Sequence, residues 1–247
     1  MVEPLFKYSG PFKAGTEILL DGVEGHHAAS VRRMRVGEAL QLTDGLGQRA
    51  RGVVTKVDKR SIVLRLDSVD FEPVCETRLT LIQAIAKGDR DELAIQAATE
   101  LGVTQVIPWQ SERTVSRWEG KEDKGKERCQ SIVDEASKQS LRAWFPEVLD
   151  VVNTAELAVL VRAAVDDGQI VLVLDPTAET GLGAVSNSAG VAVSVVVGPE
   201  GGISEAELSA LQEAGAKRVH LGSNILRTST AGVAAIAWLT ASLGVWG

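Results

Sequence analysis

Residues 191–207 have the sequence VAVSVVVGPEGGISEAE, and this stretch decides the fold. Its near-continuous run of valines predicts a strand buried on both faces, as in a parallel sheet covered by helices. The glycine-rich loop 198–202 follows, and Ser204 with Glu207 then forms a capping box that predicts the start of a helix. Strand, loop and helix in this order form one repeating unit of an α/β sheet.

The same alternation continues on both sides of this stretch. Apolar runs predict strands at residues 79–85, 105–108, 148–152, 170–175, 191–197 and 219–221. Helical periodicity, capping signals and polar runs predict helices at residues 90–101, 121–139, 155–164, 204–214 and 230–243. The fold class is therefore α/β, with a mostly parallel sheet that has helices on both faces.

The pattern before residue 72 is different. Short strands are predicted at residues 38–43, 49–57 and 61–69, with a turn at Asp44-Gly45 and a short helix at residues 26–34. Pro73 cannot join a strand ladder from the middle, so it marks a linker. We predict a small β-barrel domain at residues 1–72 and the α/β domain at residues 73–247.

The charge is unevenly distributed along the chain. The net charge is −7, but residues 1–72 hold 11 Lys and Arg against 10 Asp and Glu, whereas the remainder holds 15 against 23. Basic residues gather in the first part of the chain: Arg32, Arg33, Arg35, Arg49, Arg51, Lys56, Lys59, Arg60 and Arg65. Such a cluster fits a surface that follows phosphates, and it equally fits a solvated face, so the charge alone leaves both interpretations open.

The cellular compartment is indicated by what the sequence lacks. The two cysteines, Cys75 and Cys129, are far apart and have no metal-ligand spacing, which excludes a disulfide framework and favours a reduced cytosol. Residues 1–20 contain no apolar run as long as a signal-peptide core, and no apolar run in the chain approaches the length of a membrane span. We expect a cytoplasmic protein with no membrane partner and no metal.

Three loops that follow predicted strands are candidates for ligand binding, because ligands of such sheets bind at the carboxyl ends of the strands. They begin at Asp175-Pro176-Thr177, at Gly198 and at Gly222. Glycines let a ligand approach the backbone closely, although a tight turn into a helix also needs one or two of them. Neither a Walker phosphate loop nor a complete dinucleotide fingerprint is present.

Motifs along nearly the whole chain resemble those of the RsmE-type methyltransferases. In chain order they are His26-His27-x-x-x-Val31-Arg32-Arg33, Lys87-Gly88-Asp89-Arg90, Ala98-Thr99-Glu100-Leu101-Gly102-Val103, Glu135-Ala136-x-x-Gln139-Ser140-x-Arg142-x-x-x-Pro146, Gly198-Pro199-Glu200-Gly201-Gly202-Ile203-Ser204-Glu205 and Leu221-Gly222-x-x-Ile225-Leu226-Arg227-Thr228-x-Thr230-Ala231. One position departs from the pattern, because many members carry Glu where this chain has Ser229.

This resemblance implies a SPOUT-class enzyme that methylates N3 of a uridine in 16S ribosomal RNA of the small ribosomal subunit. The larger domain would hold a C-terminal trefoil knot and bind S-adenosylmethionine, the N-terminal domain would be PUA-like and bind RNA, and the enzyme would be a homodimer. The residues implied to bind the cofactor are Leu174, Gly198, Pro199, Glu200, Gly201, Gly202, Leu221, Gly222, Ile225, Leu226 and Thr228.

The chemistry assigns roles to two of the polar residues in these loops. Uridine N3 carries a proton at neutral pH and must lose it before it can attack a methyl group. Arg227 stays protonated, so it is the candidate that stabilises the negative charge on the uracil, while Glu200 is the candidate for contacting N3–H or the sulfonium.

Contacts with RNA are expected from a further set of residues: Arg32, Arg33, Arg35, Gln139 and Arg142. For Gln139 and Arg142, contact with a neighbouring subunit is also open. A structural role for Arg142, as a positive charge at the end of a helix, is a further alternative. His26 and His27 have no ligand spacing beside them, so they are assigned to RNA contact or to structure.

Three other functions remain open from the sequence. A nucleotide-dependent α/β protein is disfavoured by the missing phosphate loops. A non-catalytic RNA-binding factor for ribosome assembly explains the basic cluster but leaves the three glycine-containing loops unexplained. A SPOUT enzyme that acts on another RNA fits the same residues.

Overall fold

The computed structural model describes residues 2–185 and 190–246. It divides the chain into two compact units, each described here by itself. The first unit is Met1–Val74 together with Ser137–Phe145, and the second is Cys75–Ala136 together with Pro146–Gly247. The segment Ser137–Phe145 therefore belongs with the N-terminal residues, although it lies between two parts of the second unit in the sequence.

The first unit is built on a five-stranded sheet with the strand order β1-β3-β4-β5-β2. Its elements are β1 (Leu5–Lys7), β2 (Glu17–Leu20), α1 (Gly22–His26), the π-helix η1 (His27–Val31), β3 (Ala39–Thr43), β4 (Gln48–Val57) and β5 (Ile62–Phe71). β1 pairs with β3 in parallel, and the other pairs are antiparallel. Closure of this sheet into a barrel stays a prediction.

The returning segment of the first unit is attached by Trp144. Its indole Nε1 donates a hydrogen bond of 2.8 Å to the carbonyl of Glu72, and Trp144 forms a β-bridge with Leu46. Gly47 has φ +99°, and a Cβ there would lie 2.7 Å from the Trp144 ring. Both the conformation and the close approach therefore require glycine at this position.

The second unit is built on a parallel seven-stranded sheet, with the order β12-β10-β11-β6-β7-β8 and β9 also paired to β7. Its strands are β6 (Leu79–Ala84), β7 (Gln105–Gln110), β8 (Glu147–Val148), β9 (Val152–Asn153), β10 (Ile170–Leu174), β11 (Val193–Val197) and β12 (Lys217–Val219). Its helices are α2 (Arg90–Glu100), α3 (Glu122–Gln139, whose end is in the first unit), α4 (Thr154–Asp166), the short 3₁₀ helix η2 (Leu182–Ala184), α5 (Glu205–Glu213) and α6 (Thr228–Ser242).

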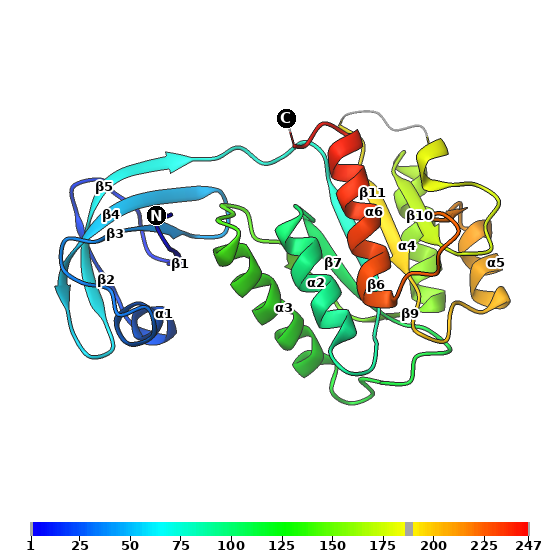
Figure 1. The fold of residues 1–247 in the computed structure, drawn as a ribbon, viewed down its shortest axis with the longest axis horizontal. Helices are drawn as coiled ribbons and strands as arrows, with labels where there is room; N and C mark the ends of the chain where they lie inside the picture. Colours follow the sequence, from blue (N-terminus) through cyan, green and yellow to red (C-terminus); the bar gives the residue numbers. More distant parts are fainter. Residues whose placement is uncertain (1, 186–189, 247) are drawn as a thin grey trace. The chain divides into compact units, whose positions relative to one another are not determined.

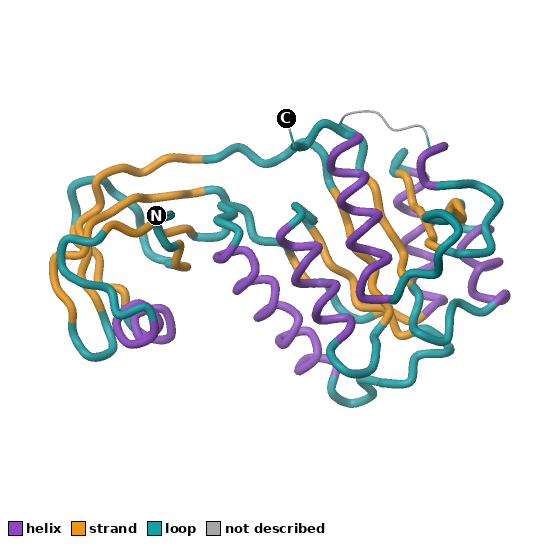
Figure 2. Tube along the Cα trace, viewed as in Figure 1, coloured by secondary structure: helices purple, strands orange, loops and turns teal. Residues whose placement is uncertain are grey.

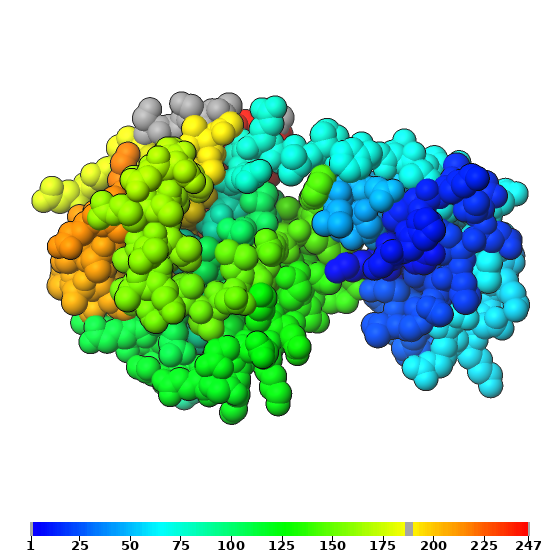
Figure 3. Space-filling model, turned by 180° about the vertical axis from the view of Figure 1, so that it is seen from behind, coloured from blue at the N-terminus to red at the C-terminus, as the bar shows by residue number. Residues whose placement is uncertain are grey.

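Helices cover both faces of this sheet, as Figures 1 and 2 show. α2 and α6 pack on one face, where one hydrophobic cluster includes Val195, and α4 and α5 pack on the other, where a second cluster includes Val196. Figure 3, seen from behind, shows the face that carries α4 and α5. The valine run of β11 is thus buried on both sides, which confirms the α/β fold class.

Three predicted elements differ from the observed ones. The strand predicted at residues 148–152 is split into β8 and β9, which pair with different parts of β7. The strand predicted at residues 219–221 instead ends at Val219, because Leu221 belongs to the loop that follows. The helix predicted at residues 26–34 starts earlier and continues as the π-helix η1.

No helix in the described part of the chain is long and apolar enough to cross a lipid bilayer.

Gly232 allows α6 to lie close to the sheet, and this closeness is testable. A Cβ at this position would lie 2.9 Å from Val197 Cγ2 and 3.0 Å from Leu81 Cδ1. We expect Gly232→Val to lower the free energy of unfolding by about 1–3 kcal/mol through overpacking, although valine is the better helix former. Urea unfolding measures the change, with Ala206→Val on the exposed surface of α5 as the control. Equal effects of the two substitutions would contradict the packing argument.

Candidate functional site

A cavity of about 650 Å³ lies where β10, β11 and β12 end. These three strands are neighbours and run in parallel, so the loops that follow them meet at one edge of the sheet. The cavity is lined by ten of the eleven residues assigned above to the cofactor: Leu174, Gly198, Pro199, Glu200, Gly202, Leu221, Gly222, Ile225, Leu226 and Thr228. The two candidate catalytic residues, Arg227 and Glu200, also line it.

Gly201 is the one assigned residue that does not line the cavity, and its neighbours explain why. A Cβ on Gly201 would lie 3.2 Å from Arg113 Cβ, and Arg113 Nη1 donates a hydrogen bond of 3.1 Å to the Gly201 carbonyl. Gly201 therefore faces Arg113. Gly202 closes the turn through its N–H, which donates to the Pro199 carbonyl at 2.9 Å, and its φ of +72° favours glycine.

The loop then enters α5 through the predicted capping box, which the structure confirms. The Ser204 side chain accepts a hydrogen bond from the Glu207 N–H, and the Glu207 carboxylate accepts one from the Ser204 N–H. Gly198 packs against the same segment, because a Cβ there would lie only 2.6 Å from Ile203 Cγ1. The loop is thus held at its start and at its end.

Thr228 connects the third loop to the second. Its buried hydroxyl donates a hydrogen bond of 2.8 Å to the Gly198 carbonyl and accepts one of 2.9 Å from Gln83 Nε2 at the end of β6. This fixes the start of α6 at the base of the cavity. The N–H groups of Thr230 and Ala231 donate hydrogen bonds to the Arg227 carbonyl. Arg227 therefore caps α6 through its main chain, and its side chain takes no part in the cap.

The third loop also brings apolar side chains to the cavity. Ile225 is 83% exposed, so its side chain does not pin the loop to the core. Leu221 and Leu226 are half-buried beside it. Gly222, with φ +110°, donates its N–H to His220 Nδ1 at 3.0 Å and so turns the chain away from β12.

Glu200 is held from one side by the segment that leads into α2. Its Oε1 accepts hydrogen bonds from the Lys87 N–H at 3.2 Å and from Arg90 Nη1 at 3.0 Å. The Lys87-Gly88-Asp89-Arg90 motif had no role assigned to it from the sequence. Arg90 also lines the cavity.

Sequence reasoning missed Arg113, Asp175 and His220 as lining residues. Asp175 began a loop that was singled out, but no role was given to its side chain. His220 follows a strand whose end was predicted two residues too late. Nothing in the local sequence marks Arg113, because its place depends on β7 and α5 being brought together by the fold.

The residues predicted to bind RNA lie in the first unit. Arg32, Arg33 and Arg35 are exposed after η1, and within the described part of the chain none of their guanidinium groups is in an ion pair. Gln139 and Arg142 lie in the returning segment Ser137–Phe145. None of the five lines the cavity, and their contact with RNA stays a prediction.

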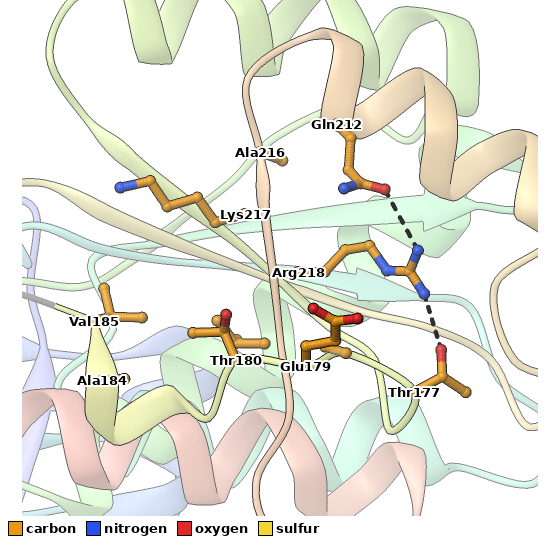
Figure 4. A pocket seen from close by; sticks show the side chains of 11 residues that line it. Thr177, Glu179, Thr180, Ala184, Val185, Gln212, Ala216, Lys217 and Arg218 are labelled. Atoms are coloured by element: carbon orange, nitrogen blue, oxygen red, sulfur yellow. Dashed lines mark hydrogen bonds between the residues drawn. The ribbon is translucent and has the colours of Figure 1, made fainter.

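Asp175 joins the site to a second cavity. Asp175 lines the first cavity, and its ion-pair partner Arg218 lines a neighbouring one of about 750 Å³. Figure 4 shows the Arg218 guanidinium between Gln212 and Thr177, to which it donates hydrogen bonds. Burial pushes the pKa of Asp175 up, but hydrogen bonds from the Thr177 N–H and hydroxyl and from Arg218 outweigh it and hold the pKa below its ordinary value.

Cys129 is a buried thiol. Burial in α3 raises the pKa of its thiol to about 12, so it stays protonated at neutral pH and is a poor nucleophile. Within the described residues, no group of three His, Cys, Asp or Glu side chains is arranged to hold a metal ion.

Profiles of two domain families match the chain. The RNA methyltransferase domain matches residues 73–240, and the RNA methyltransferase PUA domain matches residues 20–67. With a strand-end cavity in an α/β unit and a smaller β unit before it, the chain has the architecture of an RNA methyltransferase with a PUA-like domain.

Curated relatives narrow this class. The chain is 42% identical over 240 residues to ribosomal RNA small subunit methyltransferase E of Mycobacterium bovis, which covers 96% of this chain and 90% of that protein. It is 31% identical over 220 residues to the Bacillus subtilis protein of the same name, covering 86% and 85%. The chain therefore belongs to the ribosomal RNA small subunit methyltransferase E family.

Solved structures agree with this assignment. The crystal structure of a ribosomal RNA small subunit methyltransferase E from Neisseria gonorrhoeae, bound to S-adenosyl methionine, matches with a TM-score of 0.84 at 31% identity, covering 98% of both chains. A putative methyltransferase from Legionella pneumophila, in complex with the same cofactor, matches with a TM-score of 0.82 at 27% identity, also covering 98% of both chains.

The lowered pKa of Asp175 predicts a pH dependence of stability. The unfolded pKa is about 3.9, so the unfolded chain binds more protons near that pH, and the stabilisation present above about pH 4 is lost as the pH falls through the folded value. We expect Asp175→Asn to lower the free energy of unfolding by about 1 kcal/mol at pH 7, and this deficit to shrink towards pH 3. Urea titrations across this range measure it, and a deficit that does not change with pH would be the contrary result.

Proposed function

We propose that this chain transfers a methyl group from S-adenosylmethionine to N3 of a uridine in 16S ribosomal RNA of the small ribosomal subunit. The observation that carries the proposal is the cavity at the ends of β10, β11 and β12, lined by the glycine-containing loops. The relatives support it through their name, and the structural neighbours support it through their bound cofactor.

The residues around the cavity fit this cofactor. Its volume of about 650 Å³ suits a molecule of nucleoside size. Leu174, Leu221 and Ile225 offer apolar walls to an adenine ring, and Gly202 and Gly222 expose main chain in conformations that a side chain would strain. When bound, S-adenosylmethionine supplies an electrophilic methyl group on a sulfonium centre.

The fold proposed for the second unit is the SPOUT fold with a trefoil knot. The support is the contact between the segment after β12 and the loop after β10. His220 donates its N–H to the Thr180 carbonyl and accepts from the Leu182 N–H, both at 2.9 Å, and forms a parallel bridge with Gly181. A chain that passes through the loop after β10 on its way to α6 would make such contacts.

Arg227 is assigned the stabilisation of charge. As N3 loses its proton, negative charge spreads onto O2 and O4 of the uracil, and a fixed cation at that place lowers the barrier. The Arg227 side chain is exposed at the cavity, and it forms no ion pair within the described residues. Its guanidinium is therefore available to the substrate.

Glu200 is assigned to holding the loop and balancing the sulfonium charge. The contacts of Oε1 with Arg90 and the Lys87 N–H support this positioning role, because they commit one carboxylate oxygen to protein donors. The proton of N3 then leaves to water. A general-base role for Glu200 is the alternative that the pH–rate profile below distinguishes.

The partners follow from the same proposal. The PUA-like unit binds ribosomal RNA through Arg32, Arg33 and Arg35, with Gln139 and Arg142 as further contacts. Two chains form a homodimer partly through α6, whose half-buried Trp238 and the exposed Trp246 beyond it supply apolar surface. The enzyme acts in the cytoplasm, where ribosomes are assembled.

The methylation itself is tested in cells that lack this protein. We expect mass spectrometry of their 16S ribosomal RNA to show loss of one N3-methyluridine, and its return when the wild-type chain is supplied. Calorimetry of the purified protein is expected to show binding of S-adenosylmethionine and none of ATP or NAD. Unchanged ribosomal RNA together with no cofactor binding would instead favour a non-catalytic assembly factor, and methylation missing from another RNA would redirect the substrate.

The kinetics of single variants distinguish the proposed roles of Arg227 and Glu200. We expect Arg227→Ala to lower kcat ~10²–10³-fold with cofactor affinity unchanged, since only its side chain is removed. Arg227→Lys should rescue this only in part, because a point charge lacks the planar fork. For Glu200→Gln we expect weaker cofactor binding and no recovery of activity at alkaline pH, measured as a pH–rate profile with cofactor affinity at each pH. Recovery at alkaline pH would assign Glu200 as the base.

A further inference from the structure

Arg90 and Arg113 line the cavity, both side chains reach solvent, and neither has a part in the chemistry described above. They come from different elements: Arg90 begins α2, and Arg113 lies in the loop after β7. Both reach the same turn, since Arg90 contacts the Glu200 carboxylate and Arg113 contacts the carbonyl of the next residue, Gly201. The two guanidinium groups are therefore brought to one place on the rim.

The loop that carries Arg113 is anchored by Glu207. This carboxylate is 4% exposed and accepts hydrogen bonds of 2.8 Å from the Glu112 N–H and 2.7 Å from the Thr154 hydroxyl, as well as those of the Ser204 capping box. A buried carboxylate with this many donors fixes the segments that supply them. Arg113 is thus adjacent to an anchored residue and is held to the cofactor loop by Gly201.

The charges at the rim are only partly compensated. Within the described residues no carboxylate lies within ion-pair distance of Arg113, whose one hydrogen bond goes to a neutral carbonyl. Arg90 is 43% exposed in its side chain and uses Nη1 for Glu200, which leaves further N–H donors of the fork towards solvent. Glu205 also lines the cavity, and Asp175 is paired with Arg218. At the turn itself, two guanidinium groups make hydrogen bonds and one of them meets a carboxylate, that of Glu200.

We propose that Arg90 and Arg113 form a phosphate-binding site at the mouth of the cavity, which holds a phosphodiester of the substrate RNA next to the target nucleotide. The inference rests on the proposed function. A nucleotide whose base enters the cavity leaves its backbone at the mouth, and arginine forks match phosphate oxygens in a bidentate way. Such a contact positions the RNA without reading its sequence.

The test uses the full-length enzyme and small ribosomal subunits from cells that lack it. Removing one phosphate contact should lower RNA affinity and also its dependence on salt, because fewer counterions are released. We expect Arg113→Ala to weaken subunit binding about tenfold at physiological salt. The slope of log affinity against log potassium concentration, at fixed magnesium, should decrease by roughly 0.7–0.9. Because Arg113 also holds the Gly201 carbonyl, the dissociation constant for S-adenosylmethionine is measured for each variant, and RNA affinities are compared at saturating cofactor.

Two further variants separate the charge from the structural contact with Gly201. Arg113→Lys keeps the charge and loses the fork, so it should keep the wild-type salt slope with weaker binding. Arg78→Ala removes an exposed arginine just before β6, at the opposite end of the sheet from the cavity, and should match wild type. A salt slope for Arg113→Ala equal to that of wild type, or a loss of cofactor affinity with RNA affinity intact, overturns the site.

Failure of the site is distinguishable from failure of the proposed function. If wild-type enzyme methylates the subunits and Arg113→Ala binds them with wild-type affinity and salt slope, the phosphate site alone is wrong. If wild-type enzyme binds S-adenosylmethionine but transfers no methyl group to the subunits, the proposed function fails, and the site fails with it.

Discussion

The hydroxyl of Thr228 is the contact on which the site depends. From the first turn of α6, it donates a hydrogen bond to the carbonyl of Gly198, which follows β11. It also accepts a hydrogen bond from the side-chain amide of Gln83, at the end of β6. Parallel pairing brings strand ends to one edge, but it does not fix the loops beyond them. One buried hydroxyl, used as donor and acceptor, fixes the loop and the helix together and so gives Arg227 a defined place.

Glu207 has a comparable role on the other side of the same loop. Burial of a carboxylate is costly unless donors surround it, and here the donors come from Ser204, Glu112 and Thr154. These residues lie at the start of α5, after β7 and at the start of α4. The hydrogen bonds to the Glu207 carboxylate therefore hold the end of the 198–202 loop and the segment that carries Arg113. They also explain how a loop rich in glycine keeps a defined shape.

Local signals predicted the elements that local physics controls. The Ser204–Glu207 capping box and the buried valines of β11 are determined by neighbouring residues, and both were predicted correctly. The end of β12 was misplaced because Leu221 is as apolar as a strand residue and yet serves the cavity. Arg90 stood in a motif quoted from the sequence, but its role could not be assigned, and Arg113 was not found at all, since their contacts with residues 200 and 201 span 110 and 88 positions.

The returning segment Ser137–Phe145 has a consequence for the way this protein is made. The first unit needs Trp144 against Glu72 and Gly47, so residues that are synthesised early wait for residues synthesised roughly twice as far along the chain. A ribosome delivers the N-terminus first, and domains commonly fold as they emerge. Here the N-terminal unit cannot be completed until α3 and the strands β6 and β7 have already left the exit tunnel. Folding of the two units is therefore interleaved in time rather than sequential.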